Sequence, residues 1–168
     1  MKLAVAGLWV LAGVTLVAPH VRADIKVGVV VSGSGPGSAL GQPQMRTIAA
    51  LPKEIGGVPL KLIVLDDAGD PTAATTNTRR FVTESKADII MGSCITPTTI
   101  AVSTVANEAG IPHFGLAPFP INDARAKWSV DLPQSIPIMG KVLYEHMKAH
   151  NIKTVGYIGY SDSYGDLW

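Results

Sequence analysis

Short apolar runs alternate with longer amphipathic stretches along this 168-residue chain, and this alternation constrains the fold more than any other feature. Residues 25–31 form a continuous, valine-rich run that ends in a Gly/Ser cluster, which is the pattern of a strand buried on both faces of a parallel sheet. Similar runs predict further strands over residues 60–65, 88–92, 111–116 and 153–160.

Apolar residues at helical spacing fill the stretches between these runs. Gly56-Gly57 and Gly110 are expected to end the first and third helices, and Asp70 and Thr96 are expected to cap the second and third. Strands separated by single helices pair in parallel rather than as hairpins, so the chain is predicted to be an α/β protein with helices on both faces of a mostly parallel sheet. The predicted helices cover residues 40–55, 71–84, 97–110 and 138–151, with a loop over residues 117–137.

The N-terminus has the composition of a secretory signal peptide. Lys2 precedes an almost unbroken apolar stretch over residues 3–18, and Val21-Arg22-Ala23 places small residues where a signal peptidase needs them. Cleavage before Asp24, and therefore export, is expected. A membrane anchor is the alternative, but the apolar stretch is shorter than the roughly 20 residues that a span needs.

Composition argues against several other classes of function. A net charge of +1 without a basic run gives no electrostatic reason to expect nucleic acid as a partner. Cys94 is the only cysteine, so no intramolecular disulfide can form, and it is expected to be a small buried residue rather than a nucleophile. His146 and His150 lie four residues apart and could share a metal, but a solvated helix end is the favoured interpretation, and no metal or cofactor is predicted.

The best candidate site lies at the start of the third helix, because ligands of such sheets bind beyond the carboxyl ends of the strands. Pro97 fits the first helical position, and the N–H groups of Thr98 and Thr99 are expected to point outward, where they would bind a carboxylate. The alternative is that Thr96 only caps its helix and that nothing binds there.

A dinucleotide-binding enzyme is a rival interpretation. Gly33 and Gly35 match the start of a G-x-G-x-x-G motif, and Asp66 stands where an acidic residue would hold a ribose. The third glycine of the motif is missing, and a turn followed by a helix cap is the favoured role of Asp66, Asp67 and Asp70. No catalytic residue is assigned.

Segments along the whole mature chain carry a family resemblance. They are residues 25–31 (IKVGVVV), Gly35-Pro36, Leu40-Gly41, 51–57 (LPKEIGG), 65–72 (LDDAGDPT), Met91-Gly92-Ser93 with Thr96-Pro97, and 161–165 (SDSYG). In this order they resemble the N-terminal part of an ABC-importer substrate-binding protein of the leucine/isoleucine/valine-binding family. The resemblance implies a type I periplasmic-binding-protein-like fold, in which two α/β lobes close on a ligand.

The same resemblance implies a division of the chain. Residues 1–23 would be the signal peptide, 24–133 the first lobe, 134–138 the first crossover and 139–168 the start of a truncated second lobe. Binding by this chain alone is therefore expected to be weak or absent.

The resemblance also implies a ligand site, position by position. Leu40 stands where the amino-acid binders place an aromatic residue over the ligand, and Thr96 stands where they use a serine for the carboxylate. Ala117 and Phe119 match the segment that holds the ligand, and Tyr164 matches a tyrosine of the second lobe. Because the aromatic residue is absent at Leu40 and present at Phe119, an aromatic acid is as good a candidate ligand as a branched-chain or other amino acid.

The implied function is that of a periplasmic solute-binding component of an ABC importer. Such a protein is not an enzyme; it binds a small carboxylate ligand and delivers it to a permease in the inner membrane. The alternatives are an extracellular ligand-sensing domain of a receptor and, less favoured, the exported dinucleotide-binding enzyme.

Overall fold

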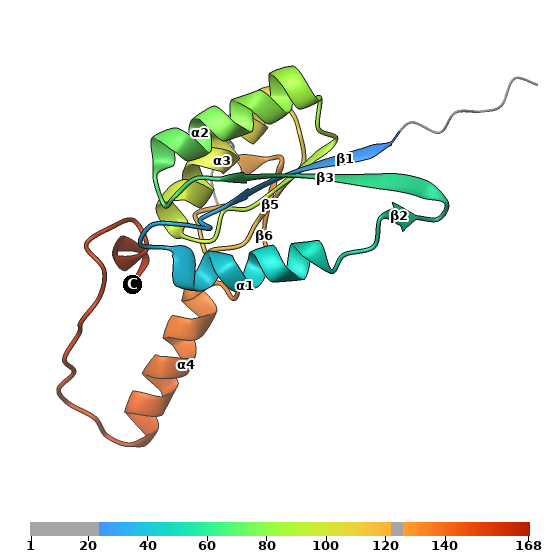
Figure 1. The fold of residues 1–168 in the computed structure, drawn as a ribbon. Helices are drawn as coiled ribbons and strands as arrows, with labels where there is room; N and C mark the ends of the chain where they lie inside the picture. The colour runs from blue at the N-terminus through green and yellow to red at the C-terminus, as the bar shows by residue number, and fades with distance from the viewer. Residues whose placement is uncertain (1–23, 122–125) are drawn as a thin grey trace, which may run out of the picture.

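The computed structural model describes residues 24–121 and 126–168. Within these residues, strands form a six-stranded sheet in the order β2-β3-β1-β4-β5-β6 (Figure 1). Every neighbouring pair is parallel except β2 and β3, which confirms the predicted α/β class and its mostly parallel sheet. The strands are β1 (Ile25–Val31), β2 (Glu54–Ile55), β3 (Val58–Asp66), β4 (Ile89–Met91), β5 (His113–Gly115) and β6 (Ser129–Asp131).

Helices cover both faces of this sheet. In Figure 1, α1 (Ser38–Ala49) lies on one face, while α2 (Pro71–Arg80) and α3 (Thr96–Ala109) lie together on the other. α4 (Ile136–Ala149) projects away from the sheet. Two short helical segments complete the described chain: a π-helical turn that extends α2 (Phe81–Ser85) and a 3-10 helix near the C-terminus (Gly165–Leu167).

The core lies between the sheet and the α2 and α3 pair. Phe81, at the end of α2, is fully buried together with Val30, Ile90 and Val102. Gly28 of β1 makes room for the Phe81 ring, because a Cβ atom at Gly28 would lie 2.5 Å from that ring. Burial of such side chains is the main favourable term that holds helices on a sheet.

The ends of α2 and α3 show how local sequence sets element boundaries. Asp70 caps α2 as predicted, since its Oδ1 accepts a hydrogen bond of 2.7 Å from the N–H of Ala73, with Pro71 in the first turn. Gly110 ends α3 as predicted, and its positive φ of 68° is a conformation that glycine adopts without steric cost.

The first predicted helix is too long. α1 ends at Ala49, and Gly56-Gly57 form the turn of a hairpin between β2 and β3 instead of ending a helix. Both glycines have positive φ, 57° and 75°, which a two-residue hairpin turn of this kind requires. A hairpin therefore occurs where single-helix connections had been predicted throughout.

The predicted loop over residues 117–137 is also wrong in part. Ser129–Asp131 pairs with β5 as β6, and α4 begins at Ile136 rather than Ile138, inside the predicted crossover. Three residues of mixed polarity carry no periodic signal, so only their pairing with β5 makes them a strand.

The strand predicted over residues 153–160 does not form. These residues belong to no regular element, and Val155, Ile158 and Tyr160 have exposed fractions of 65%, 100% and 74%. A strand needs a neighbour for its backbone hydrogen bonds, and the described residues place none beside this segment.

Among the described residues, none of the helices combines the length and the apolar character that crossing a membrane requires. The predicted signal peptide lies outside the described residues.

Candidate functional site

The candidate site is the edge of the sheet where β1, β3, β4 and β5 end. These strands are parallel, so the segments that follow them meet at one edge. The segments are residues 32–37, 67–70, 92–95 and 116–120. Side-chain hydrogen bonds join the first three of these segments to one another, and the start of α3 is bonded to the fourth.

Asp67 ties three of these segments together. Its Oδ1 accepts hydrogen bonds from the Ser32 hydroxyl at 2.7 Å and the Gly69 N–H at 2.8 Å, and its Oδ2 accepts one from the Ser93 hydroxyl at 2.6 Å. Asp67, Ser32 and Ser93 are all fully buried. A buried carboxylate with three donors fixes the relative position of the three strand ends.

Asp66 is exposed and binds the loop that follows β1. Its Oδ1 accepts the N–H groups of Gly33, Ser34 and Ala68 at 2.8, 3.3 and 2.8 Å. Partial burial would raise the pKa of Asp66, but hydrogen bonds from Ser34, Ala68 and Gly33 outweigh that effect and lower the pKa below its ordinary value. Together with the cap at Asp70, these bonds favour turn and cap roles for the acidic residues over a ribose-binding role.

Thr96 does not cap its own helix, so that prediction is wrong. Ile95 occupies the cap position without a side-chain bond, and Thr96 is the first helical residue. Its hydroxyl instead donates to the carbonyl of Pro118 at 2.7 Å, which ties the start of α3 to the segment after β5. Thr96 and Pro118 are 22 residues apart, so only the folded chain brings them together and the sequence gives no sign of this bond.

The helix start offers fewer free N–H groups than predicted. The Thr99 N–H donates to the Ile95 carbonyl at 2.9 Å, and the Thr98 hydroxyl donates to the same carbonyl at 3.0 Å. Thr96 and Thr98 have exposed fractions of 2% and 0%, so both lie beneath the surface of the edge.

Ala117 and Phe119 also lie beneath that surface, each with an exposed fraction of 5%. The Phe119 ring packs against the ring of His113, with 5.7 Å between centroids. The structure thus brings Thr96, Ala117 and Phe119 together as a buried floor behind the strand ends.

Leu40 and Tyr164 are placed differently. Leu40 lies on α1 with an exposed fraction of 57%. The described ring contacts of Tyr164 are with Tyr160 and Trp168, at 6.3 and 6.5 Å between centroids. No contact among the described residues joins Tyr164 to this floor at the ends of β1, β3, β4 and β5.

Asp131 is a candidate that the sequence did not reveal. It ends β6 beside Gly115, and its Oδ1 is buried without a hydrogen-bond partner among the described residues. Burial raises the pKa of Asp131, and a hydrogen bond from the Phe119 backbone offsets only part of that effect. Because residues 117–137 read as a loop, no local signal placed this carboxylate at a strand end.

A buried histidine, His113 of β5, links the end of β4 to β6. His113 places Nε2 against the carbonyl of Gly92 and Nδ1 3.0 Å from the Ser129 hydroxyl. Since a carbonyl only accepts, Nε2 carries the proton, and the Ser129 hydroxyl donates to Nδ1. Burial lowers the pKa of His113 to about 4, although the bond to Gly92 acts in the opposite direction.

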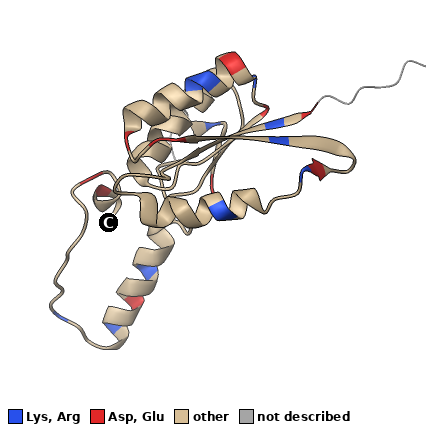
Figure 2. Cartoon of the chain, viewed as in Figure 1, with Lys and Arg blue, Asp and Glu red and all other residues tan. Residues whose placement is uncertain are grey.

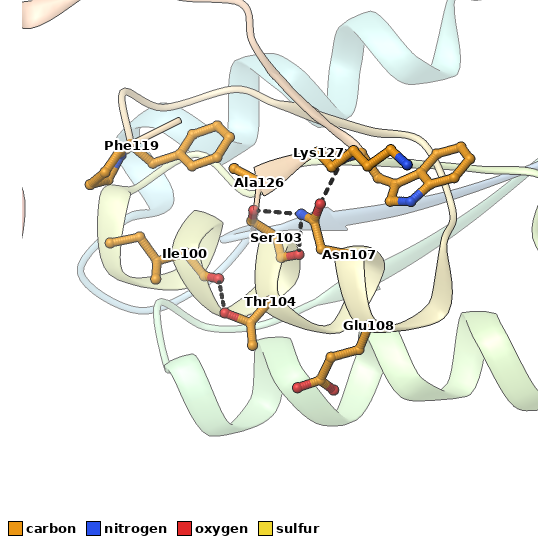
Figure 3. Close-up of a pocket in the computed structure, with 10 residues that line it drawn as sticks. Ile100, Ser103, Thr104, Asn107, Glu108, Phe119, Ala126 and Lys127 are labelled. Atoms are coloured by element: carbon orange, nitrogen blue, oxygen red, sulfur yellow. Dashed lines mark hydrogen bonds between the residues drawn. The ribbon is translucent and has the colours of Figure 1, made fainter. Parts of the chain in front are cut away.

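A separate groove of about 510 Å³ lies along α3 (Figure 3). Its walls include Ile100, Thr104 and Asn107 of α3, together with Lys127 and Trp128. Phe119 alone belongs both to this groove and to the floor described above. No cluster of three or more His, Cys, Asp or Glu side chains in the described ranges is arranged to hold a metal ion.

Comparison with known proteins gives one consistent result. The model of the periplasmic binding protein family matches residues 24–167. A Leu/Ile/Val-binding protein homolog 7 from Brucella abortus is 36% identical over 99 residues, which are 56% of this chain and 25% of the relative.

Solved structures agree with this match. An extracellular ligand-binding receptor from Rhodopseudomonas palustris HaA2 is 69% identical, with a TM-score of 0.83 over 87% of this chain and 41% of that one. A solute-binding protein of an ABC transporter from Rhodopseudomonas palustris BisB5, in complex with 3,4-dihydroxybenzoic acid, shares the fold with a TM-score of 0.78 at 21% identity, over 86% of this chain and 41% of that one.

The chain thus spans 25% of the curated relative and 41% of each of these two structures. These relatives are named as binding proteins and receptors rather than as enzymes. The family resemblance and the type I fold predicted from the sequence are both confirmed, and the chain belongs to the periplasmic binding protein family.

Proposed function

We propose that the protein is the extracytoplasmic solute-binding component of an ABC importer and that this chain supplies the first lobe's side of its ligand site. The observation that carries the proposal is the locked edge of the sheet, where Asp67 joins three strand ends and Thr96 joins the fourth. Loops that are already ordered in the free protein lose little conformational entropy when a ligand binds, so binding is stronger.

The proposed ligand is a small carboxylate, either a branched-chain or other amino acid or an aromatic acid. The start of α3 faces this edge, and helix starts favour negative charge through their dipole. Lys26 and Lys61 are neighbours in the strand register near the amino ends of β1 and β3, away from the site. Figure 2 shows the other Lys and Arg residues dispersed over the molecule. Neutral hydrogen-bond donors would therefore bind the carboxylate.

The predicted site residues take two roles in this proposal. Thr96, Thr98, Ala117 and Phe119, which are buried, would form the floor of the ligand site, and Leu40, which is exposed on α1, would lie at its rim. Tyr164 would contribute from the second lobe, which begins near residue 139 after a crossover at residues 134–138. Asp131 Oδ1, which has no hydrogen-bond partner among the described residues, would accept a hydrogen bond from the ammonium group of an amino acid or the hydroxyl group of a phenolic acid.

Ligand titration of the protein expressed from its gene tests this proposal. Leucine, isoleucine, valine and benzoate-type acids are titrated by calorimetry against the wild type, Thr96→Val and Thr104→Val. We expect at least one ligand to bind, and Thr96→Val to weaken it by about tenfold, because the loss of one hydrogen bond of about 1 to 1.5 kcal/mol releases Pro118.

Thr104→Val is the matched control. It removes a hydroxyl from the same helix, where, within residues 24–121 and 126–168, the hydroxyl bonds only the Ile100 carbonyl and lines the groove. Equal weakening by both variants would place the ligand elsewhere, and the absence of binding by any carboxylate would contradict the proposal.

Export is tested separately. Expression of the full reading frame in a Gram-negative host, followed by fractionation and N-terminal sequencing, should give a periplasmic product that begins at Asp24. A product that keeps Lys2 in the membrane fraction would instead identify an anchor.

A further inference from the structure

Two histidine rings lie close together at the end of α4, His146 in its last turn and His150 at its C-cap. His146 and His150 are both exposed, and their ring centroids are 4.2 Å apart with 33° between the ring planes. Residues four apart lie on the same side of a helix, so the two rings project in the same direction.

A hydrogen bond sets the proton position on one of these rings. His150 Nδ1 lies 2.9 Å from the backbone carbonyl of His146. Because a carbonyl only accepts, Nδ1 carries the proton, and Nε2 of the neutral ring keeps a lone pair that can bind a metal ion. Metal-binding histidines are commonly oriented in this way, with the second ring nitrogen donating to a carbonyl or carboxylate.

The surroundings of the pair favour a cation. Lys148 is two residues from each histidine, which places it about 200° around the helix and therefore on the opposite side. Glu145 is paired with Lys141 at 3.8 Å, so its carboxylate does not compete for the rings. The carbonyl groups at the end of α4 add the negative end of the helix dipole.

We propose that His146 and His150 form a two-histidine binding site for a divalent transition-metal ion that prefers imidazole, namely Cu²⁺, Ni²⁺ or Zn²⁺, with water completing its coordination. Metal–nitrogen bonds of about 2.0 to 2.1 Å let one ion bridge nitrogens up to about 4 Å apart, a separation that histidines four residues apart on one side of a helix can reach by side-chain rotation. The site lies on α4 and is independent of the ligand site at the strand ends.

The probe is Cu²⁺, which forms the strongest complexes in this series. One equivalent is added to the untagged chain that begins at Asp24, electron paramagnetic resonance counts the nitrogen donors, and calorimetry gives the affinity. We expect one saturable site with two imidazole nitrogens. His146→Gln and His150→Gln should each weaken binding by at least tenfold and leave one nitrogen donor, whereas Lys148→Gln, the control on the same turn, should bind as the wild type does.

Several outcomes would overturn the inference. They are a wild-type spectrum with fewer than two imidazole nitrogens, no saturation up to millimolar Cu²⁺, or unchanged affinity in both histidine variants. Circular dichroism checks that the variants keep α4. Should they lose it, selective broadening of the His146 and His150 ring signals by Cu²⁺ in the wild type decides the question without any variant.

Discussion

Asp67 and His113 are buried polar side chains whose partners come from distant parts of the chain. Asp67 accepts hydrogen bonds from Ser32 and Ser93, which lie 35 and 26 residues away, and His113 bonds the carbonyl of Gly92, 21 residues away. A buried polar group without a partner costs far more than a satisfied one contributes. Changes at these two residues should therefore have large and specific effects.

Asp67→Ala is expected to lower the free energy of unfolding by about 3 kcal/mol, because it leaves buried hydroxyl and N–H donors without an acceptor. Asp67→Asn should cost about 1 kcal/mol, since its amide oxygen still accepts and its amide nitrogen can donate to Ser93. Urea unfolding at pH 7 measures both changes. Equal losses for the two variants would show that charge, rather than hydrogen-bond satisfaction, matters at this position.

His113 should make stability depend on pH. Its pKa is about 4 in the folded protein and about 6.5 when unfolded, so between these values the unfolded state binds more protons. Stability contributed by the neutral ring is therefore complete above pH 6.5 and is lost as pH falls toward 4, by about 3 kcal/mol in total.

Urea unfolding between pH 4.5 and 7.5 tests this dependence. His113→Gln cannot titrate, so its stability should change less over this range than that of the wild type. Parallel pH profiles for the two proteins would assign the dependence to other groups.

At the scale of elements, α2 and α3 begin in different ways. The cap of α2 is local, because Asp70 and Ala73 are three residues apart, and it was predicted correctly. The cap predicted for α3 was wrong, because Thr96 bonds Pro118, which lies 22 residues away. Local hydrogen bonds can be predicted from sequence, while a side chain with a better distant partner cannot.

Asp70→Ala should lower the free energy of unfolding by about 1 kcal/mol through the loss of this cap, and Asp70→Asn should be nearly neutral, because asparagine caps equally well. Thermal unfolding of the three proteins gives the comparison. A large loss in the asparagine variant would mean that Asp70 acts through its charge.

At the scale of the molecule, the buried core and the exposed apolar surface are separate. Phe81 and its neighbours are buried between the sheet and two helices, whereas Ile138, Val142 and Leu143 of α4 have exposed fractions of 65%, 61% and 51%. Stability of this chain should therefore depend on the sheet with α1 to α3 far more than on α4.

Phe81→Ala should cost about 3 to 5 kcal/mol, as expected for removing a buried aromatic ring, and Val142→Ala should cost less than about 0.5 kcal/mol. Chemical denaturation of both variants at the same protein concentration tests this contrast. A comparable loss for Val142→Ala would show that the apolar face of α4 is packed in solution.

The sequence by itself determined the α/β class, the family, the cap at Asp70 and the helix end at Gly110, because periodicity, caps and glycine positions act over a few residues. Tertiary structure decided that residues 129–131 form a strand, that Asp131 lies at a strand end, and that Thr96 holds Pro118. It also left the apolar run at residues 153–160 without strand structure. Strand pairing and buried hydrogen bonds depend on partners far away in the sequence, so local pattern cannot specify them.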